Sequence, residues 1–158
     1  MEIERKWLID PKNIPYDLST LEHCEIEQAY ISFSPTIRVR KMNDDRFILT
    51  VKSKPVGNGL SREEYELDIS RQDFDNLLKK AEGNIINKTR YYFHRDDGLL
   101  EEIDIFHGIF EGLSYMDIEF SSDKDAEGFP SPYWVTRDVS KENGFSNDSL
   151  ARNGMPDI

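Results

Sequence analysis

Residues 36–52 read TIRVRKMNDDRFILTVK, and this stretch decides the fold. Before the polar turn Asn43–Asp45, Arg38 and Arg40 alternate with isoleucine and valine, and a second alternating run after the turn ends at Lys52. A period of two is typical of a β-strand with one polar and one apolar face. The stretch therefore predicts two strands separated by a turn, with cations along one face.

The same period of two recurs along most of the chain. Polar residues, proline and glycine separate many of the runs, and Asp97-Gly98 indicates a tight hairpin turn because glycine accepts a positive φ. Many strands with short turns are typical of a β-sandwich or a β-barrel, and closure into a barrel also removes exposed sheet edges. The predicted strands are Glu2–Ile9, Glu27–Phe33, Thr36–Met42, Arg46–Ser53, Ser61–Ile69, Ile86–Arg95, Leu99–Phe106 and Tyr115–Ser121.

Helical spacing is clear in one segment only. Ser70 is a suitable N-cap, and apolar residues at helical spacing follow it as far as Ala81. Gly83 is predicted to end this helix. Shorter helices are predicted over Asp123–Gly128 and near Asn147–Arg152. The predicted class is therefore mainly β, with a few helices that cover the sheet.

The bulk composition suits one domain that spans residues 1–158 around a single core. A net charge of −11 excludes a general binder of nucleic acid or of anionic membranes, which would carry a basic face. The single cysteine, Cys24, excludes an intrachain disulfide and fits a reducing compartment. The charged N-terminus differs from a signal peptide, and no apolar run approaches the length of a membrane span. We therefore expect a cytoplasmic protein without nucleic-acid or membrane partners.

Sorting each strand by parity places most charged side chains on one face. The cations and the anions fall on different strands, whereas a solvated face usually mixes the two signs. One interpretation is a set of solvated faces, as in most half-buried sheets. The other is a barrel whose apolar outer face is covered by helices and whose charges point inward. The cationic positions are Arg38, Arg40, Lys52, Lys88 and Arg90, and the anionic ones are Glu102, Asp104, Asp117 and Glu119.

An interior that carries these charges has a clear chemical use. Clustered carboxylates repel one another, and hard divalent cations relieve that repulsion. Rows of arginine and lysine bind phosphate oxygens, and arginine adds a bidentate fork. Carboxylates, a metal ion and several cations together indicate a site for a highly charged polyphosphate. The acidity of the whole chain does not conflict with this, because the basic groups are local.

A series of short motifs runs in order through nearly the whole chain. Taken alone, the opening motif Glu2-Ile3-Glu4-Arg5-Lys6, of the form ExExK, carries little information. The motifs that follow are Gln28-Ala29-Tyr30, Arg38-Val39-Arg40, Thr50-Val51-Lys52-Ser53, Leu60-Ser61-Arg62-Glu63-Glu64-Tyr65-Glu66, Lys88-Thr89-Arg90-Tyr91, Glu102-Ile103-Asp104, Asp117-Ile118-Glu119, and Asn147 with Leu150. The full series resembles the CYTH, or triphosphate tunnel metalloenzyme, superfamily, and in particular its short bacterial members similar to inorganic triphosphatases.

This resemblance implies a closed eight-stranded antiparallel β-barrel, a tunnel that binds a triphosphate together with Mg²⁺ or Mn²⁺. A metal-activated water would attack a terminal phosphate. The implied metal ligands are Glu2, Glu4, Asp104, Asp117 and Glu119. The implied phosphate-binding residues are Lys6, Arg38, Arg40, Lys52, Arg62, Lys88 and Arg90, and catalytic roles are implied for Lys6, Arg62 and Glu64. Glu66 is expected to orient a neighbouring side chain.

Two positions depart from the family pattern. Asp117 stands where the family commonly carries glutamate, so that ligand is shorter by one methylene. Ser146 precedes Asn147, where close relatives often have a lysine, so one phosphate contact or one plug contact is expected to be missing.

Three functions fit the resemblance. The first is hydrolysis of a small-molecule triphosphate, with inorganic tripolyphosphate as the best single choice. The second is a class IV-type adenylate cyclase, which shares the tunnel and makes cyclic AMP from ATP, but no residues that would hold adenine and ribose can be identified. The third is a non-catalytic polyphosphate-binding module, against which the complete carboxylate set argues. A homodimer is compatible with the sequence.

Overall fold

The computed structural model describes residues 2–54 and 61–158, except for the side chains of Glu2 and Ser61. Within these ranges the chain forms strands, α-helices and short 3₁₀ helices. The strands are β1 (Glu2–Ile9), β2 (Glu22–Ser32), β3 (Thr36–Met42), β4 (Arg46–Lys52), β5 (Ser61–Arg62), β6 (Glu64–Asp68), β7 (Glu82–His94), β8 (Leu100–Phe106), β9 (Ser114–Glu119) and β10 (Val135–Asp138). The helices are α1 (Arg71–Leu78), α2 (Asp123–Gly128) and α3 (Asn147–Asn153), with 3₁₀ turns at η1 (Pro11–Asn13), η2 (Leu18–Thr20) and η3 (Gly108–Phe110).

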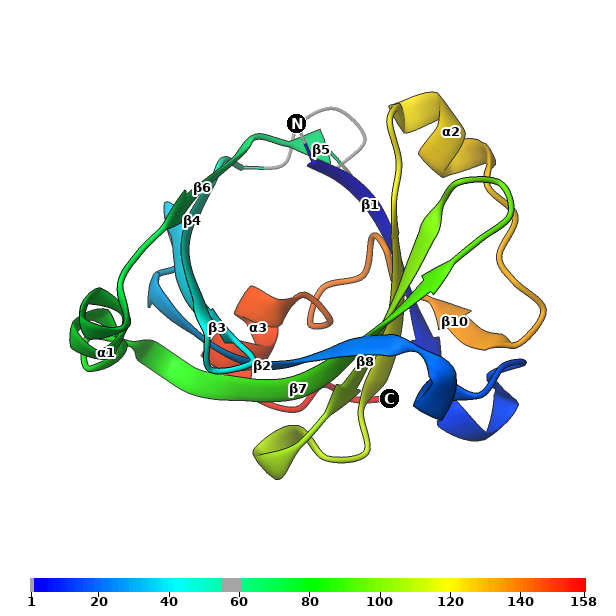
Figure 1. The fold of residues 1–158 in the computed structure, drawn as a ribbon. Coiled ribbons are helices and arrows are strands. Elements are labelled where there is room, and N and C mark those ends of the chain that lie inside the picture. Colours follow the sequence, from blue (N-terminus) through cyan, green and yellow to red (C-terminus); the bar gives the residue numbers. More distant parts are fainter. Residues whose placement is uncertain (1, 55–60) are drawn as a thin grey trace.

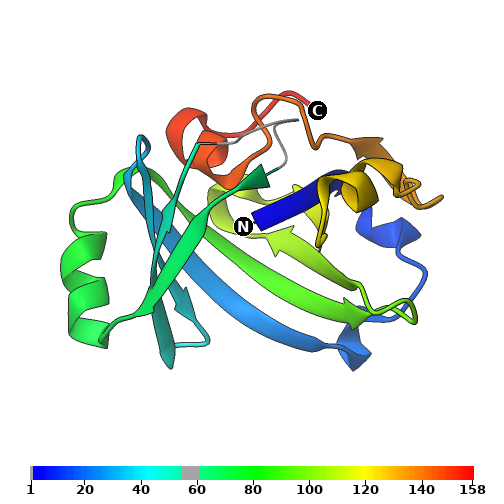
Figure 2. The same cartoon turned by 90° about the horizontal axis from the view of Figure 1, so that it is seen from above.

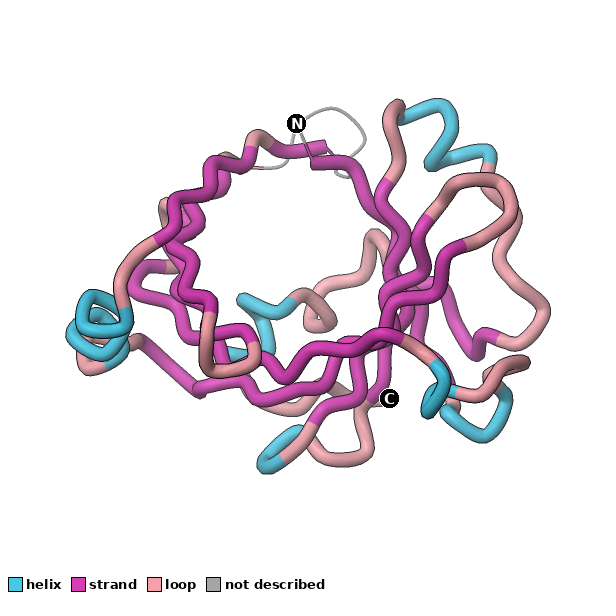
Figure 3. Tube along the Cα trace, viewed as in Figure 1, coloured by secondary structure: helices cyan, strands magenta, loops and turns pink. Residues whose placement is uncertain are grey.

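The strands form one antiparallel sheet that curls into a ring (Figure 1). Its order is β10-β1-β9-β8-β7-β2-β3-β4-β6, and β5 pairs with β1. Only Glu63 separates β5 from β6, so this short segment pairs with β1 through β5 and with β4 through β6 (Figure 3). The junction with β1 consists of two residue pairs, Glu2 with Arg62 and Ile3 with Ser61. The curled antiparallel sheet is confirmed, while closure by a continuous ladder stays a prediction.

The turn between β3 and β4 has the backbone that its sequence predicts. Asn43 and Asp44 have φ values of 53° and 68°, and the Asp45 amide donates to the Met42 carbonyl at 3.2 Å. Two consecutive positive φ values define the type of hairpin turn that matches strand twist, and Asn and Asp tolerate this conformation. The turn fixes a register in which Arg38 lies opposite Thr50. It therefore also fixes which face the arginines occupy.

Covered apolar faces on the outside of the ring decide between the two interpretations of the charges. On one side, Phe74 of α1 packs against Val39 and Phe47. On the other, Trp7 and Ile118 belong to a cluster that extends to α2 and the segment before β10. Both clusters use the parity opposite to that of the charged positions. The charged side chains therefore face the interior of the ring, as the barrel interpretation predicts.

An apolar cluster closes one end of the interior. It joins inward positions near the strand ends, such as Tyr30, Ile86 and Phe106, to Leu150 of α3. Figure 2 shows α3 across this end of the ring. Gly83 allows the close approach of β7 to α3, because its φ is +73° and an added Cβ would lie 2.1 Å from the Ala151 carbonyl oxygen. The barrel therefore has a plugged end, formed by this cluster and α3.

The structure corrects several sequence-based boundaries. Helix α1 begins after the predicted N-cap Ser70 but ends at Leu78, and Gly83 lies inside β7 instead of ending the helix. The predicted strand 61–69 is interrupted at Glu63. Strand β10 was not predicted, because Val135–Asp138 is too short for a period to show. Helices α2 and α3 lie where they were predicted.

Arg5 faces outward, as alternation predicts, yet it is buried. Its guanidinium donates to the carbonyl oxygens of Ala126 and Phe129 at 2.6 and 2.9 Å, and to Asp138 at 2.5 Å. These contacts attach α2 and β10 to the outside of β1. Across the described residues, no helix is both long and apolar enough to traverse a bilayer.

Candidate active site

A cavity of about 410 Å³ occupies the interior of the ring above the plugged end. All of its lining residues are polar, and all but one are charged. They are Glu4, Arg38, Arg40, Lys52, Glu64, Glu66, Arg90, Glu102, Asp117, Glu119 and Asn147. The cations come from β3, β4 and β7, whereas all of the lining carboxylates come from β1, β6, β8 and β9. One side of the cavity is therefore cationic and the rest is acidic.

The arginines of β3, Arg38 and Arg40, form one part of the cationic side. Arg38 is 4% exposed, its Nη2 lies 3.4 Å from Thr50 Oγ1, and its buried Nε has no hydrogen-bond partner among the described residues. Arg40 donates from Nε to Gln28 Oε1 at 2.8 Å. Burial and the neighbouring Arg38 and Arg90 lower the pKa of Arg40 to about 9. Among the described residues neither arginine forms an ion pair with a carboxylate, so positive charge accumulates here and favours an anionic ligand.

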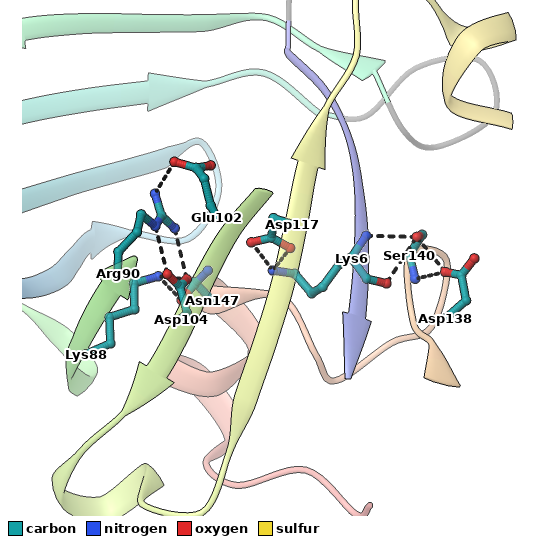
Figure 4. A network of polar contacts seen from close by, with 9 residues as sticks. All are labelled: Lys6, Lys88, Arg90, Glu102, Asp104, Asp117, Asp138, Ser140 and Asn147. Atoms are coloured by element: carbon teal, nitrogen blue, oxygen red, sulfur yellow. Dashed lines mark hydrogen bonds and ion pairs between the residues drawn. The ribbon is translucent and has the colours of Figure 1, made fainter. Parts of the chain in front are cut away.

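A second group of cations lies deeper, around Asp104 (Figure 4). Asp104 is fully buried and accepts from Lys88 Nζ at 2.7 Å and from Arg90 Nε and Nη2 at 2.7 and 2.9 Å. Lys88 also donates to Asn147 Oδ1 at 3.2 Å, and Arg90 lies 3.3 Å from Glu102. Burial opposes the charge of Asp104, but Arg90 and Lys88 outweigh it and hold its pKa well below the usual range. We call these three residues, Lys88, Arg90 and Asp104, the floor of the cavity.

Lys6 and Asp117 form a second buried pair beside the floor (Figure 4). The Lys6 ammonium lies 2.8 and 3.0 Å from the two Asp117 oxygens and 4.5 Å from the centre of the Tyr115 ring. The Lys6 amide donates to Ser140 Oγ at 3.0 Å, which attaches the C-terminal segment to β1. Burial opposes the charge of Lys6, but Asp117 and Glu4 raise its pKa. Lys6 therefore forms a buried ion pair with a carboxylate in this structure.

The candidate metal ligands lie on β1 and β9. Glu4 and Glu119 are opposite each other in the strand register, and both line the cavity with Asp117. Burial, followed by the charges of Glu4 and Asp104, raises the pKa of Asp117, while Lys6 opposes the rise. These oxygen donors suit a hard divalent cation, which would offset their mutual repulsion. Among the described side chains, which exclude that of Glu2, no three His, Cys, Asp or Glu groups gather closely enough to hold a metal.

The structure brings most of the predicted site residues together. Eight of them line the cavity, namely Glu4, Arg38, Arg40, Lys52, Glu64, Arg90, Asp117 and Glu119. Lys6, Lys88 and Asp104 lie behind this lining in buried ion pairs. Arg62 donates to the Ser53 carbonyl at 3.1 Å and is not part of the lining, and the side chain of Glu2 lies outside the described residues.

Three other residues belong to the site but were not predicted as site residues. Alternation placed Glu102 on the charged face with Asp104, but no metal-binding, phosphate-binding or catalytic role was assigned to it. Asn147 begins α3 and reaches the cavity from the plugged end, which requires knowledge of the tertiary fold. Gln28 contacts Arg40 across the β2–β3 register, and pairing of the two strands would have been needed to find it.

A curled antiparallel sheet around a cavity of segregated charges defines a class of polyanion-binding β-barrel proteins. Comparison with known proteins gives the family. The CYTH domain model matches residues 1–143, and the chain belongs to this family.

Two relatives of similar length are both named inorganic triphosphatase. A protein of Nitrosomonas europaea named inorganic triphosphatase is 34% identical over 154 residues, which cover 95% of this chain and 96% of the relative. One of Acetivibrio thermocellus with the same name is 32% identical over 155 residues, which cover 96% and 94%. A crystal structure of an inorganic triphosphatase aligns with a TM-score of 0.68 at 30% identity, over 96% of this chain and 94% of that one.

Proposed function

We propose that this protein hydrolyses triphosphates and that inorganic tripolyphosphate is its preferred substrate. The observation that carries the proposal is the pair Arg38 and Arg40, which faces an acidic wall across one cavity without a carboxylate partner of its own among the described residues. A linear polyanion would fill the cationic side. The two relatives named inorganic triphosphatase support the same substrate.

In this proposal, the role of each cavity residue follows from its position. Arg38, Arg40, Lys52 and Arg90 would bind phosphate oxygens, and arginine forks would fix the orientation of the chain of phosphates. Glu64 lies 4.0 Å from Lys52, so it would position that lysine. On the floor, Asp104 holds Lys88 and Arg90 in place. Burial, Arg90 and Arg40 lower the pKa of Lys88 to about 7, while Asp104 opposes the fall. Both residues would stabilise negative charge on the phosphate nearest to them, Lys88 in its protonated form.

Enzymes of this family depend on a metal ion, and we propose Mg²⁺ or Mn²⁺ here. Glu4, Asp117 and Glu119 would hold it, together with Glu2 from the start of β1. Such an ion would supply positive charge against the phosphate oxygens and would lower the pKa of a water, which is the nucleophile in our proposal. Lys6 and the metal ion would compete for the carboxylate of Asp117. Lys6 would then exchange its contact with Asp117 for one with the substrate.

An adenylate cyclase would need a surface for adenine. The eleven residues that line the cavity in the described part of the chain include no aromatic or aliphatic side chain against which a purine could pack. No observation therefore favours the cyclase. A nucleoside attached to a bound triphosphate would lie outside the cavity and contribute little to binding. We place the enzyme in the cytoplasm, where its buried free thiol, Cys24, stays reduced.

The test is phosphate release by the purified protein from tripolyphosphate, pyrophosphate, ATP and thiamine triphosphate, with Mg²⁺ or Mn²⁺. We expect tripolyphosphate to give the highest kcat/KM, and EDTA to abolish turnover. Cyclic AMP as the main product from ATP would instead establish the cyclase. Tight binding of tripolyphosphate without any release of phosphate would establish the non-catalytic module.

A further inference from the structure

Gln28 is the polar neighbour of Arg40 across the β2–β3 register. It is 0% exposed, lies directly opposite Arg40, and accepts from Arg40 Nε through Oε1 at 2.8 Å. Among the described residues, no other group forms a hydrogen bond with the Arg40 guanidinium. Gln28 is not part of the cavity lining. Any effect of Gln28 on ligand binding would therefore act through Arg40.

The orientation of the Gln28 amide is determined by Arg40. Arg40 can only donate, so the amide must turn its oxygen toward Nε. This leaves Gln28 Nε2 buried without a hydrogen-bond partner among the described residues. A buried donor without a partner lowers stability. Packing alone would favour an apolar residue of similar volume at this position, so the amide indicates a role other than stability.

The arginines that line the cavity differ in the charge of their partners. Arg90 is bound by two carboxylates, Asp104 and Glu102, which offset part of its charge. Arg38 and Arg40 are held by the hydroxyl of Thr50 and the amide of Gln28, both neutral. A neutral acceptor fixes the plane of a guanidinium but leaves its full charge available. The low pKa of Arg40, caused by burial and by Arg38 and Arg90, reflects the same uncompensated charge.

We propose that Gln28 is a positioning residue for the phosphate-binding Arg40. Its carbonyl occupies Nε and so directs the two terminal nitrogens of the guanidinium toward the cavity, while its neutrality preserves the charge that attracts the polyanion. This inference rests on the proposed triphosphatase function. Two properties of the side chain are separable, because glutamate would keep the acceptor but add a charge, and methionine would keep the volume but remove the acceptor.

The experiment compares Gln28→Glu and Gln28→Met with the parent. Kinetics on tripolyphosphate give kcat and KM, calorimetry in EDTA gives the affinity for tripolyphosphate without turnover, and melting curves report the fold. The matched control is Asn87→Asp, which adds the same charge at an exposed position of the neighbouring strand β7. We expect the control to behave like the parent.

For Gln28→Glu we expect an unchanged or higher melting temperature, together with a KM and a calorimetric dissociation constant raised at least about tenfold, because one adjacent cation is neutralised. For Gln28→Met we expect a KM within about threefold of the parent and a kcat lowered at least about fivefold, because the guanidinium loses its fixed plane.

Parent-like kinetics of either folded variant would overturn the inference. If Gln28→Glu does not fold, Gln28→Met decides alone. If the parent itself releases no phosphate from any triphosphate, the proposed function fails, and the calorimetric comparison still decides whether Gln28 controls anion binding.

Discussion

Replacing Asp104 with asparagine tests how the floor of the cavity is held together. Asp104 is completely buried and contacts the ammonium of Lys88 and two nitrogens of Arg90 within 2.9 Å. Asparagine keeps the shape and one acceptor oxygen but removes the negative charge. Arg90 and Lys88, whose pKa is already lowered to about 7 by burial and the two nearby arginines, would then share one neutral acceptor. Glu102, 3.3 Å from Arg90, would remain as an ion-pair partner.

Removing one partner of a buried ion pair typically costs about 3–5 kcal/mol. Because one acceptor and Glu102 remain, we expect the lower end, about 3 kcal/mol. For a chain of this length each kcal/mol shifts the melting temperature by about 2–4 °C, so the variant should melt about 6–12 °C lower. The folded-state pKa of Asp104 is depressed, so its contribution is complete above the unfolded value of about 3.9 and is lost as pH falls further.

The assay is thermal and urea unfolding at pH 7 in EDTA, so that metal binding contributes nothing. The control is Asp68→Asn, because Asp68 is 80% exposed and its distance to Arg46 is 3.6 Å; we expect a change below about 0.5 kcal/mol. The sequence-based assignment of Asp104 as a metal ligand makes the opposite prediction. A ligand without other partners would leave the metal-free protein unchanged, or more stable through reduced repulsion with Asp117. Unchanged melting of Asp104→Asn in EDTA would therefore refute the structural role of the floor.

Three further predictions concern the cavity and its outer support. Arg40→Lys should lower kcat/KM at least about tenfold at nearly constant melting temperature, because lysine lacks the fork that Gln28 orients, whereas exposed Arg46→Lys should match the parent. Glu4→Gln should reduce turnover at least about a hundredfold and raise the metal concentration needed for half-maximal rate. The control Glu22→Gln, at the exposed start of β2, should behave like the parent. Equal metal titrations of Glu4→Gln and the parent would show that Glu4 is not a metal ligand. Burial opposes the charge of Asp138, but hydrogen bonds from Ser140 and Arg5 lower its pKa. Its contribution to stability is therefore present above the unfolded pKa and is lost as pH falls. Asp138→Asn should melt at a lower temperature than the parent at pH 7, and melting curves toward pH 3 should show a smaller difference.

The sequence allowed the architecture and the inward face to be predicted because alternation is a local property. Parity on β3 placed Arg38 and Arg40 together, and the turn residues Asn43 and Asp44 fixed the pairing with β4. The covering helix α1 could also be predicted, since its N-cap Ser70 and apolar spacing lie within one short segment. Local chemistry was sufficient for each of these features.

Depth inside the barrel could not be predicted in the same way. Lys6, Lys88 and Arg40 share an inward parity, but only Arg40 lines the cavity, because strand tilt and α3 decide how far each row lies from the plugged end. Parity also gives no information about partners. The contact between Gln28 and Arg40 depends on the register of two strands, and Asn147 arrives from a helix more than forty residues beyond β8.

The plugged end of the barrel limits how a substrate enters the cavity and how a product leaves it. In the described part of the chain, Leu150 and Phe106 pack across this end, so a ligand that enters along the barrel axis would leave through the opposite end. Under the proposed function, a linear chain of phosphates would enter with one end leading, and its terminal unit would lie nearest the floor. We would then expect phosphate to be released from the end of the chain, and the product to leave through the opening that admits the next substrate.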